Sequence, residues 1–131
     1  MTVKWQILNL CIVSILSGLS VNLQAASCPQ DPAKEAKPGV SWRNCDLSGA
    51  DLARVDLSGA DLSNAVLTNT DFTGANLTSV NFRNAELKGT KLLLADLRKA
   101  DLTGAYLRLA DLRRADLREA RLNCFNHYFC K

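Results

Sequence analysis

Apolar and polar residues follow a period of five along most of this chain. Between residues 45 and 124 the sequence divides without a gap into sixteen five-residue units. The third place of each unit is Leu, apart from Phe72 and Phe82, and the first place is Ala, Val or Thr after Cys45. The second place is mostly Asp or Asn, and the last two places hold mainly residues that suit turns. The chain is therefore organised as an array of internal repeats.

This period predicts short extended sides joined by corners. An apolar, polar, apolar sequence over three residues is typical of a strand with one buried face. An α-helix would need apolar residues spaced by 3.6, and a step of five would wind the apolar stripe around its axis. No single unit can bury its own Leu. We therefore expect the chain to form stacked coils about 4.8 Å apart, with every Leu pointing inward.

The repeated unit Ala-Asp-Leu-x-x, seen at residues 95–99 and 100–104, resembles the pentapeptide-repeat family. The resemblance covers residues 45–124 without interruption. It implies an all-β fold, a right-handed quadrilateral parallel β-helix with four units in each coil. Sixteen units then make about four coils. The spacing by itself gives inward-facing places and corners, and the number of sides and the handedness come from the family.

Residues 1–26 have the layout of a secretory signal peptide. Lys4 supplies a positive charge, a mainly apolar run covers residues 7–21, and small residues at Ala25 and Ala26 suit cleavage. The run is shorter than the roughly 20 residues that a membrane span needs. We expect cleavage after Ala26 or Ala25, and an uncleaved anchor or a lipid-modified Cys28 are the alternatives.

Two segments are expected to cap the ends of the coil. Residues 27–44 contain three prolines, and Asp31 with Pro32 suits one capped helical turn. Trp42 falls at the third place of a degenerate first repeat, where its ring would cover the open end of the core. Residues 125–131 break the pattern and concentrate aromatic side chains. Caps of this kind protect the unpaired edges of a stacked sheet, and the terminal repeats of solenoids are atypical.

The chain has five cysteines, of which Cys11 lies in the leader. Cys45 and Cys124 bracket four coils, which places them about 15–20 Å apart at the usual strand spacing. A disulfide needs Cα atoms within roughly 7 Å, so this distance disfavours pairing between the two ends. We predict Cys28–Cys45 and Cys124–Cys130, each holding a cap in place. Such bonds fit an exported chain in an oxidising compartment.

A metal site is the alternative for the C-terminal cysteines. Cys124, His127 and Cys130 are ligand types that suit zinc or copper. Only these three ligands are local and no fourth is apparent. We therefore favour the disulfide, and we expect neither a metal nor a cofactor.

The charge distribution is more informative than the total. The formal net charge is +3, which is too small to indicate nucleic-acid binding. The first coils are acidic, whereas the last coils are basic. In a coil of twenty residues Asp56, Asn76, Asp96 and Asp116 would form one column. A mutually screened charged surface is the simplest interpretation, and an anion-binding or partner-binding arginine patch is the alternative.

Several apolar residues occupy places that are polar in other units, and contiguous exposed apolar patches indicate interfaces. In a four-sided coil they fall on two adjoining sides near the third and fourth coils. We treat them, with neighbouring arginines, as a candidate interaction surface, and incidental exposure is the alternative. Its members are Leu93, Leu94, Tyr106, Leu109, Arg108, Arg113, Arg114 and Arg118.

No catalytic constellation is apparent in the sequence. It has one His, no Ser/His/Asp set and no phosphate-binding glycine loop, and its Asp residues recur with the structural period. A packed coil also leaves no internal ligand cavity. We expect a non-enzymatic interaction or scaffold protein, exported to a bacterial periplasm or secreted. Its expected partner is an unknown protein or an anionic envelope surface, with no nucleic acid and no membrane span in the mature chain.

Two other functions remain open. Some members of the pentapeptide-repeat family imitate duplex DNA and bind a type II topoisomerase. That role would need a strongly acidic cytoplasmic rod, whereas this chain has a leader, cysteines and an arginine-rich end. The other possibility is an anion-binding or polysaccharide-binding surface on the arginine-rich C-terminal coils.

Overall fold

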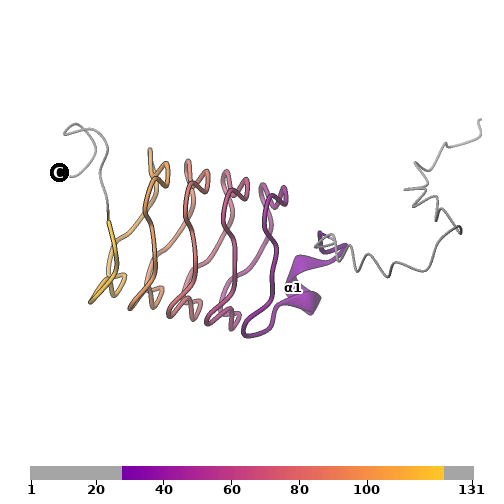
Figure 1. Ribbon diagram of the computed structural model, residues 1–131, viewed down its shortest axis with the longest axis horizontal. Coiled ribbons are helices and arrows are strands. Elements are labelled where there is room, and N and C mark those ends of the chain that lie inside the picture. Colours follow the sequence, from indigo (N-terminus) through magenta and orange to yellow (C-terminus); the bar gives the residue numbers. More distant parts are fainter. Residues whose placement is uncertain (1–27, 123–131) are drawn as a thin grey trace, which may run out of the picture.

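The structure is a computed structural model and describes residues 28–122 (Figure 1). The chain winds into a right-handed quadrilateral parallel β-helix, as the repeat pattern and the family resemblance predicted. Successive coils are joined by thirteen isolated parallel bridges, and every bridge links residues twenty apart. From Ser41 to Arg121 the chain therefore completes four turns. The predicted register of four units in each coil is confirmed.

The second-place residues form a column on each of the four sides, which we call faces A to D in the order the chain visits them. Each column is defined by its bridges. Face A carries Ser41, Asp61, Asn81, Asp101 and Arg121; face B carries Asp46, Val66, Glu86 and Tyr106; face C carries Asp51, Asp71, Lys91 and Asp111; face D carries Asp56, Asn76, Asp96 and Asp116.

The third-place side chains fill the axis of the coil. From Leu47 to Leu102 all of them are at most 3% exposed. Phe72 and Phe82 are neighbours in this core and pack edge to face, with ring centroids 6.0 Å apart. Burial falls towards the C-terminal end of the described range, where Leu122 is 47% exposed. Stability in this fold therefore comes from aliphatic side chains that are buried only because another coil lies above and below.

Backbone hydrogen bonds hold the coils in register. The Leu77 N–H donates to the Asp96 carbonyl at 2.8 Å, and the Asn76 N–H donates to the Val55 carbonyl at 2.9 Å. Within each corner the third-place carbonyl accepts from the next first-place N–H, as in Val80 to Leu77 at 3.1 Å. The second-, third- and fifth-place amides thus donate to carbonyls of neighbouring coils, and the first-place amide donates within its own corner. In the described range the fourth-place amide has no backbone acceptor and faces outward.

Every corner ends in a residue with positive φ. From Gly39 to Glu119 all fifth-place residues have left-handed backbone, including eleven that are not glycine. This conformation costs a side chain-bearing residue roughly 1–2 kcal/mol, which explains the frequent Gly and Asn. Leu94 (φ 59°) and Leu109 (φ 62°) adopt this unfavourable conformation although each carries a large apolar side chain.

A short cap covers the N-terminal end of the coil. It contains helix α1 (Pro32–Glu35), in which the Asp31 side chain accepts from the Lys34 N–H at 3.3 Å. Glu35 accepts in return from the Asp31 N–H at 3.0 Å, so the helical turn is capped as the sequence predicted. Trp42 is 2% exposed, which agrees with its predicted place at the end of the core.

The Cys28–Cys45 disulfide is present and ties this cap to the first coil, with Cα atoms 5.4 Å apart. No helix within residues 28–122 has the length and apolar character needed to cross a bilayer. Four other expectations fall outside the described residues. They concern the leader, the Cys124–Cys130 pair, the alternative metal ligands and the C-terminal cap.

We expect Leu77→Ala to lower the free energy of unfolding by about 2–5 kcal/mol, because it leaves a cavity in the middle of the stack. Leu122→Ala removes the same atoms from a half-exposed place and should cost clearly less. Urea denaturation followed by circular dichroism measures both. Equal losses would show that the third-place residues do not share one sealed axis.

Candidate interaction surface

The second-place Asp and Asn side chains are part of the corner structure. In all eleven such units from 45 to 116 the side-chain Oδ1 accepts from the backbone N–H two residues later, at 2.9–3.2 Å. This is the local bond by which Asp and Asn favour turns. The interpretation of the Asp columns as a mutually screened charged surface is therefore incomplete, because each of these side chains satisfies the outward-facing amide of its own corner. The recurring Asp-x-Ser and Asp-x-Thr spacing carries that signal.

Three arginines extend this bond. Arg98, Arg113 and Arg118 each follow an Asp by two residues. In each case one carboxylate accepts from both the backbone N–H and the guanidinium of the same arginine. For Arg113 the N–H and Nε bonds to Asp111 Oδ1 measure 3.2 and 2.8 Å, and Nη2 donates to Oδ2 at 2.8 Å. The Arg118 bonds to Asp116 are alike.

These bonds lower the pKa of two carboxyls. The Arg113 guanidinium holds the pKa of Asp111 at about 2, and Arg118 does the same for Asp116. Two of the four arginines in the predicted surface, Arg113 and Arg118, are therefore already neutralised by a local carboxylate.

Contacts between coils separate the like charges. The predicted column of Asp56, Asn76, Asp96 and Asp116 is confirmed, and Asn76 Nδ2 donates to Asp56 at 3.1 Å. On face C, Lys91 Nζ lies 3.0 Å from Asp71 Oδ2. On face A, Asn81 Nδ2 likewise donates to Asp61 Oδ1 at 3.0 Å, so each of these three faces has second-place side chains bonded to one another across coils.

Face B is different. Only its first unit has Asp in the second place, and Val66, Glu86 and Tyr106 follow in the next three coils. None of these three side chains accepts from the amide two residues later. As a result the N–H groups of Thr68, Lys88 and Arg108 have no acceptor within residues 28–122. They form a column of outward-facing donors in three successive coils, whereas faces A and C each have one such amide in the described range, at Arg43 and Leu93.

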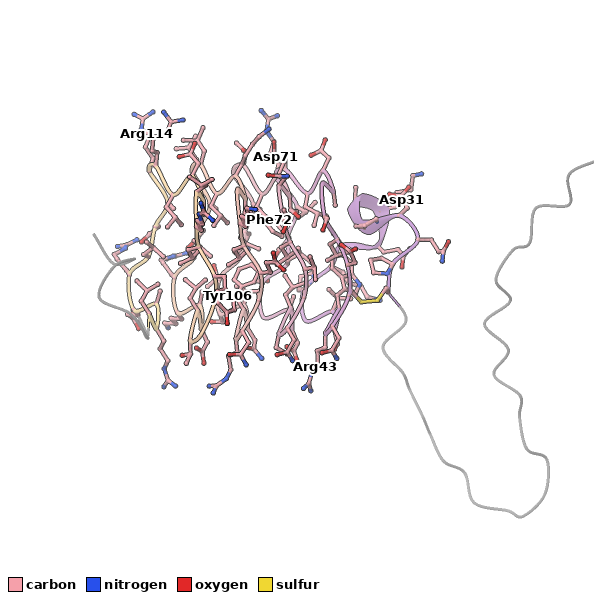
Figure 2. All side chains as sticks on the ribbon, turned by 90° about the horizontal axis from the view of Figure 1, so that it is seen from above. Asp31, Arg43, Asp71, Phe72, Tyr106 and Arg114 are labelled. Atoms are coloured by element: carbon pink, nitrogen blue, oxygen red, sulfur yellow. A yellow bond between two sulfur atoms is a disulfide. The ribbon has the colours of Figure 1, made fainter. Side chains whose placement is uncertain are left out.

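The predicted apolar residues separate into two groups. Tyr106, 67% exposed, lies on face B, and Leu109, 76% exposed, ends the same unit. Leu94 is 54% exposed and Leu93 is half-buried, and both end a unit of face C. Figure 2 shows Tyr106 on a different part of the surface from Arg114, which projects at the C-terminal end.

Face B also carries a shallow depression of about 330 Å³, lined by Glu86, Lys88, Tyr106 and Arg108. We call these four residues together with Leu109 the face-B patch. Within the described range neither Lys88 nor Arg108 lies within 4.0 Å of a carboxylate. The sequence analysis included Tyr106, Arg108 and Leu109 but missed Glu86 and Lys88. In the sequence these two are ordinary polar residues, and only the twenty-residue register places them next to Tyr106 and Arg108 in the neighbouring coil.

The family description "Pentapeptide repeats" matches residues 39–69, 56–92 and 94–124, with eight copies. This chain belongs to the pentapeptide-repeat family. No curated protein matches it by sequence.

Solved structures of other pentapeptide-repeat proteins resemble this one. Rfr23 from the cyanobacterium Cyanothece 51142 superposes with a TM-score of 0.65 at 29% identity, over 66% of this chain and 58% of that protein. HetL from Nostoc sp. strain PCC 7120, a protein involved in heterocyst differentiation regulation, superposes at 0.62 with 36% identity, over 63% of this chain. Only 38% of HetL is covered, so this chain spans a little over half of one relative and less than half of the other.

We expect Asp51→Ala to lower the melting temperature by roughly 2–6 °C, because it removes the acceptor for the Ala53 N–H. Asp51→Asn keeps an Oδ1 acceptor, as Asn76 and Asn81 do, and should leave the melting temperature nearly unchanged. Thermal unfolding of the two variants distinguishes a structural side chain from a merely solvated one, for which Ala and Asn would behave alike.

Arg113→Ala should raise the pKa of Asp111 from about 2 towards its ordinary value near 3.8, because the guanidinium is the main cause of the shift. A carboxyl with a depressed pKa stabilises the fold above its unfolded pKa, and this contribution disappears as the pH falls through the folded value. The wild type should therefore lose stability between about pH 4 and pH 2. Carbon-13 NMR titration of Asp111 measures the shift, and an unchanged pKa in the variant would refute the pairing.

Proposed function

We propose that this chain is a non-enzymatic interaction or scaffold module that works outside the cytoplasm and presents one side of its rod to a partner protein. The observation that carries the proposal is the unequal use of the four faces. Within residues 28–122, three fourth-place amides on face B lack an acceptor, against one on face A, one on face C and none on face D. On face B these amides lie beside two cations without ion-pair partners, Lys88 and Arg108, and beside the exposed side chains of Tyr106 and Leu109.

A non-enzymatic role is supported by what the carboxylates do. The Asp side chains, which are the chain's main candidates for acids or bases, accept from backbone amides at 2.9–3.2 Å. The apolar axis is filled by Leu and Phe, and the depression on face B is shallow and open to solvent. HetL, a relative of similar architecture, is involved in the regulation of heterocyst differentiation.

Export is supported by two independent features. The first 26 residues have the composition of a signal peptide. Cys28 and Cys45 lie at disulfide distance, and structural disulfides persist in oxidising compartments.

Charge disfavours the DNA-mimic alternative. Residues 81–122 contain ten basic and six acidic side chains, so the C-terminal half of the described rod is positive. A surface that imitates duplex DNA must be strongly negative. Anionic envelope material is a second possible partner for this basic half, and the following experiment separates it from a protein.

The decisive experiment is chemical cross-linking of the epitope-tagged protein in its own cells, followed by capture and mass spectrometry. We expect a small, reproducible set of envelope proteins that is lost when Arg108 and Tyr106 are both replaced by Ala. The control is the double variant Arg113→Ala with Arg118→Ala. It removes two arginines, one more than the first variant, but it leaves face B intact and should therefore retain the partner. Capture of no protein, or of lipid and polysaccharide alone, would contradict the proposal.

Export itself predicts the mass of the isolated protein. We expect cleavage after Ala25 or Ala26, and protection of Cys28 and Cys45 from alkylation until a reductant is added. Intact-mass spectrometry with and without dithiothreitol measures both. An uncleaved chain whose two cysteines alkylate freely would place the protein in a reducing compartment and defeat the proposal.

A further inference from the structure

We propose that the face-B patch binds a carboxylate side chain from an acidic, partly apolar segment of the partner protein. This carboxylate would take the position that Asp holds in neighbouring units. The inference rests on the proposed interaction role and adds to it a site and the chemistry of the segment that the site recognises.

The first argument is the comparison of four units that carry Arg in the fourth place. In the units of Arg98, Arg113 and Arg118 a single Asp accepts from both the backbone N–H and the guanidinium. The unit at residues 105–109 has Arg in the same place, but its second residue is Tyr106. Arg108 therefore presents the same two kinds of donor with no carboxylate of its own.

The second argument is the column below Arg108. The amides of Lys88 and Thr68 also lack an acceptor in the described part of the chain, because Glu86 and Val66 replace Asp in their units. Successive coils place these donors about 4.8 Å apart. Carboxylates are the strongest acceptors for such groups, since charge-assisted bonds exceed neutral ones in strength.

The third argument is charge complementarity. The patch holds two cations without ion-pair partners, Lys88 and Arg108, and one carboxylate, Glu86, which accepts from Thr68 Oγ1 at 3.4 Å. It lies in the basic half of the rod. An acidic segment is therefore attracted to this site, whereas a basic segment or a nucleic acid backbone beside Glu86 gains less.

The fourth argument decides for a protein segment. Tyr106 and Leu109 are exposed by 67% and 76%, and Leu109 also occupies a left-handed corner where Gly or Asn would cost less. An exposed apolar side chain at a corner that Gly or Asn would occupy at lower cost offers the isolated rod no benefit, and contiguous exposed apolar surface marks interaction sites. Their aliphatic and aromatic surface suits the apolar side chains of a protein better than a simple anion or a sugar acid.

The site is small, so it should bind one short segment weakly, as transient interfaces do. A synthetic peptide in which glutamate alternates with leucine and phenylalanine is a suitable probe. We expect its titration into nitrogen-15-labelled protein, isolated from cells expressing the full chain, to shift the amide signals of Lys88 and Arg108. The amides of Arg113 and Arg118, which already have a carboxylate acceptor, should move little.

Tyr106→Asp is the sharpest variant, because it supplies the missing carboxylate from within the chain. It introduces the residue that most other units carry, so the coil should remain folded and the Arg108 amide should become bonded to a carboxylate, as the Arg113 amide is. We expect it to weaken peptide binding by about tenfold or more, because a bond to a charged group is worth at least that change in affinity. Arg108→Ala should do the same, and its matched control Arg113→Ala should not.

Leu109→Asn separates binding from folding. Asn tolerates positive φ better than Leu, so the variant should melt at an equal or higher temperature while binding the peptide more weakly. A variant that lost stability together with binding would instead assign Leu109 a structural role and remove it from the site.

Four outcomes would overturn the proposal: no shift of the Arg108 amide, equal binding by Tyr106→Asp, equal or stronger shifts with an oligoglucuronate, or the same shifts on raising the protein concentration without peptide. The last would identify a second copy of the chain as the occupant. Cross-linked partners that survive Tyr106→Asp would reject this site and leave the proposed function standing. Peptide binding in vitro without any cross-linked partner in cells would support the site and reject the proposed function.

Discussion

The coil-to-coil register of twenty residues is the constraint on which the rest of this structure depends. It seals the third-place side chains in one axis, and it pairs the second-, third- and fifth-place amides with neighbouring coils. The first-place amide bonds within its own corner, and in the repeat pattern of residues 28–122 only the fourth-place amide has no backbone acceptor. A second-place Asp or Asn satisfies it locally, so one side-chain choice in every five residues determines whether a corner is closed or still able to donate.

This local bond distinguishes the corners of an otherwise regular coil from one another. Where the second place is Asp, the corner is complete and a following arginine is neutralised, as at Arg113 and Arg118. Where the second place is Tyr106, the arginine, the amide and the ring all remain available on one face. A repeat protein of this kind can change its binding surface unit by unit without changing its core, because second-place and core residues point in opposite directions.

Much of the fold was predictable from the sequence because its period is strict. Spacing, the family resemblance and elementary geometry together predicted four features. These are the inward Leu residues, the stacked column of Asp56 and Asn76, the helical turn at Asp31 and the Cys28–Cys45 pair. The site was harder. Grouping Leu93 and Leu94 with Tyr106 relied on pattern departures alone, and the role of Asp as an amide acceptor depends on side-chain geometry that hydropathy does not carry. Lys88 belongs to the candidate site only because its backbone amide has no acceptor and its side chain has no ion-pair partner in the described range, which the sequence does not reveal.

Amide hydrogen exchange followed by NMR tests the central claim most directly, because it measures each corner separately. The account predicts that the fourth-place amides of Arg113 and Arg118 exchange slowly relative to those of Lys88 and Arg108, although all four residues are exposed arginines or lysines on the outer surface. Third-place amides such as that of Leu77 should exchange most slowly of all. Equal exchange at the four fourth-place amides would contradict the division of the corners into those closed by a second-place Asp or Asn and those left open, three of which lie on face B.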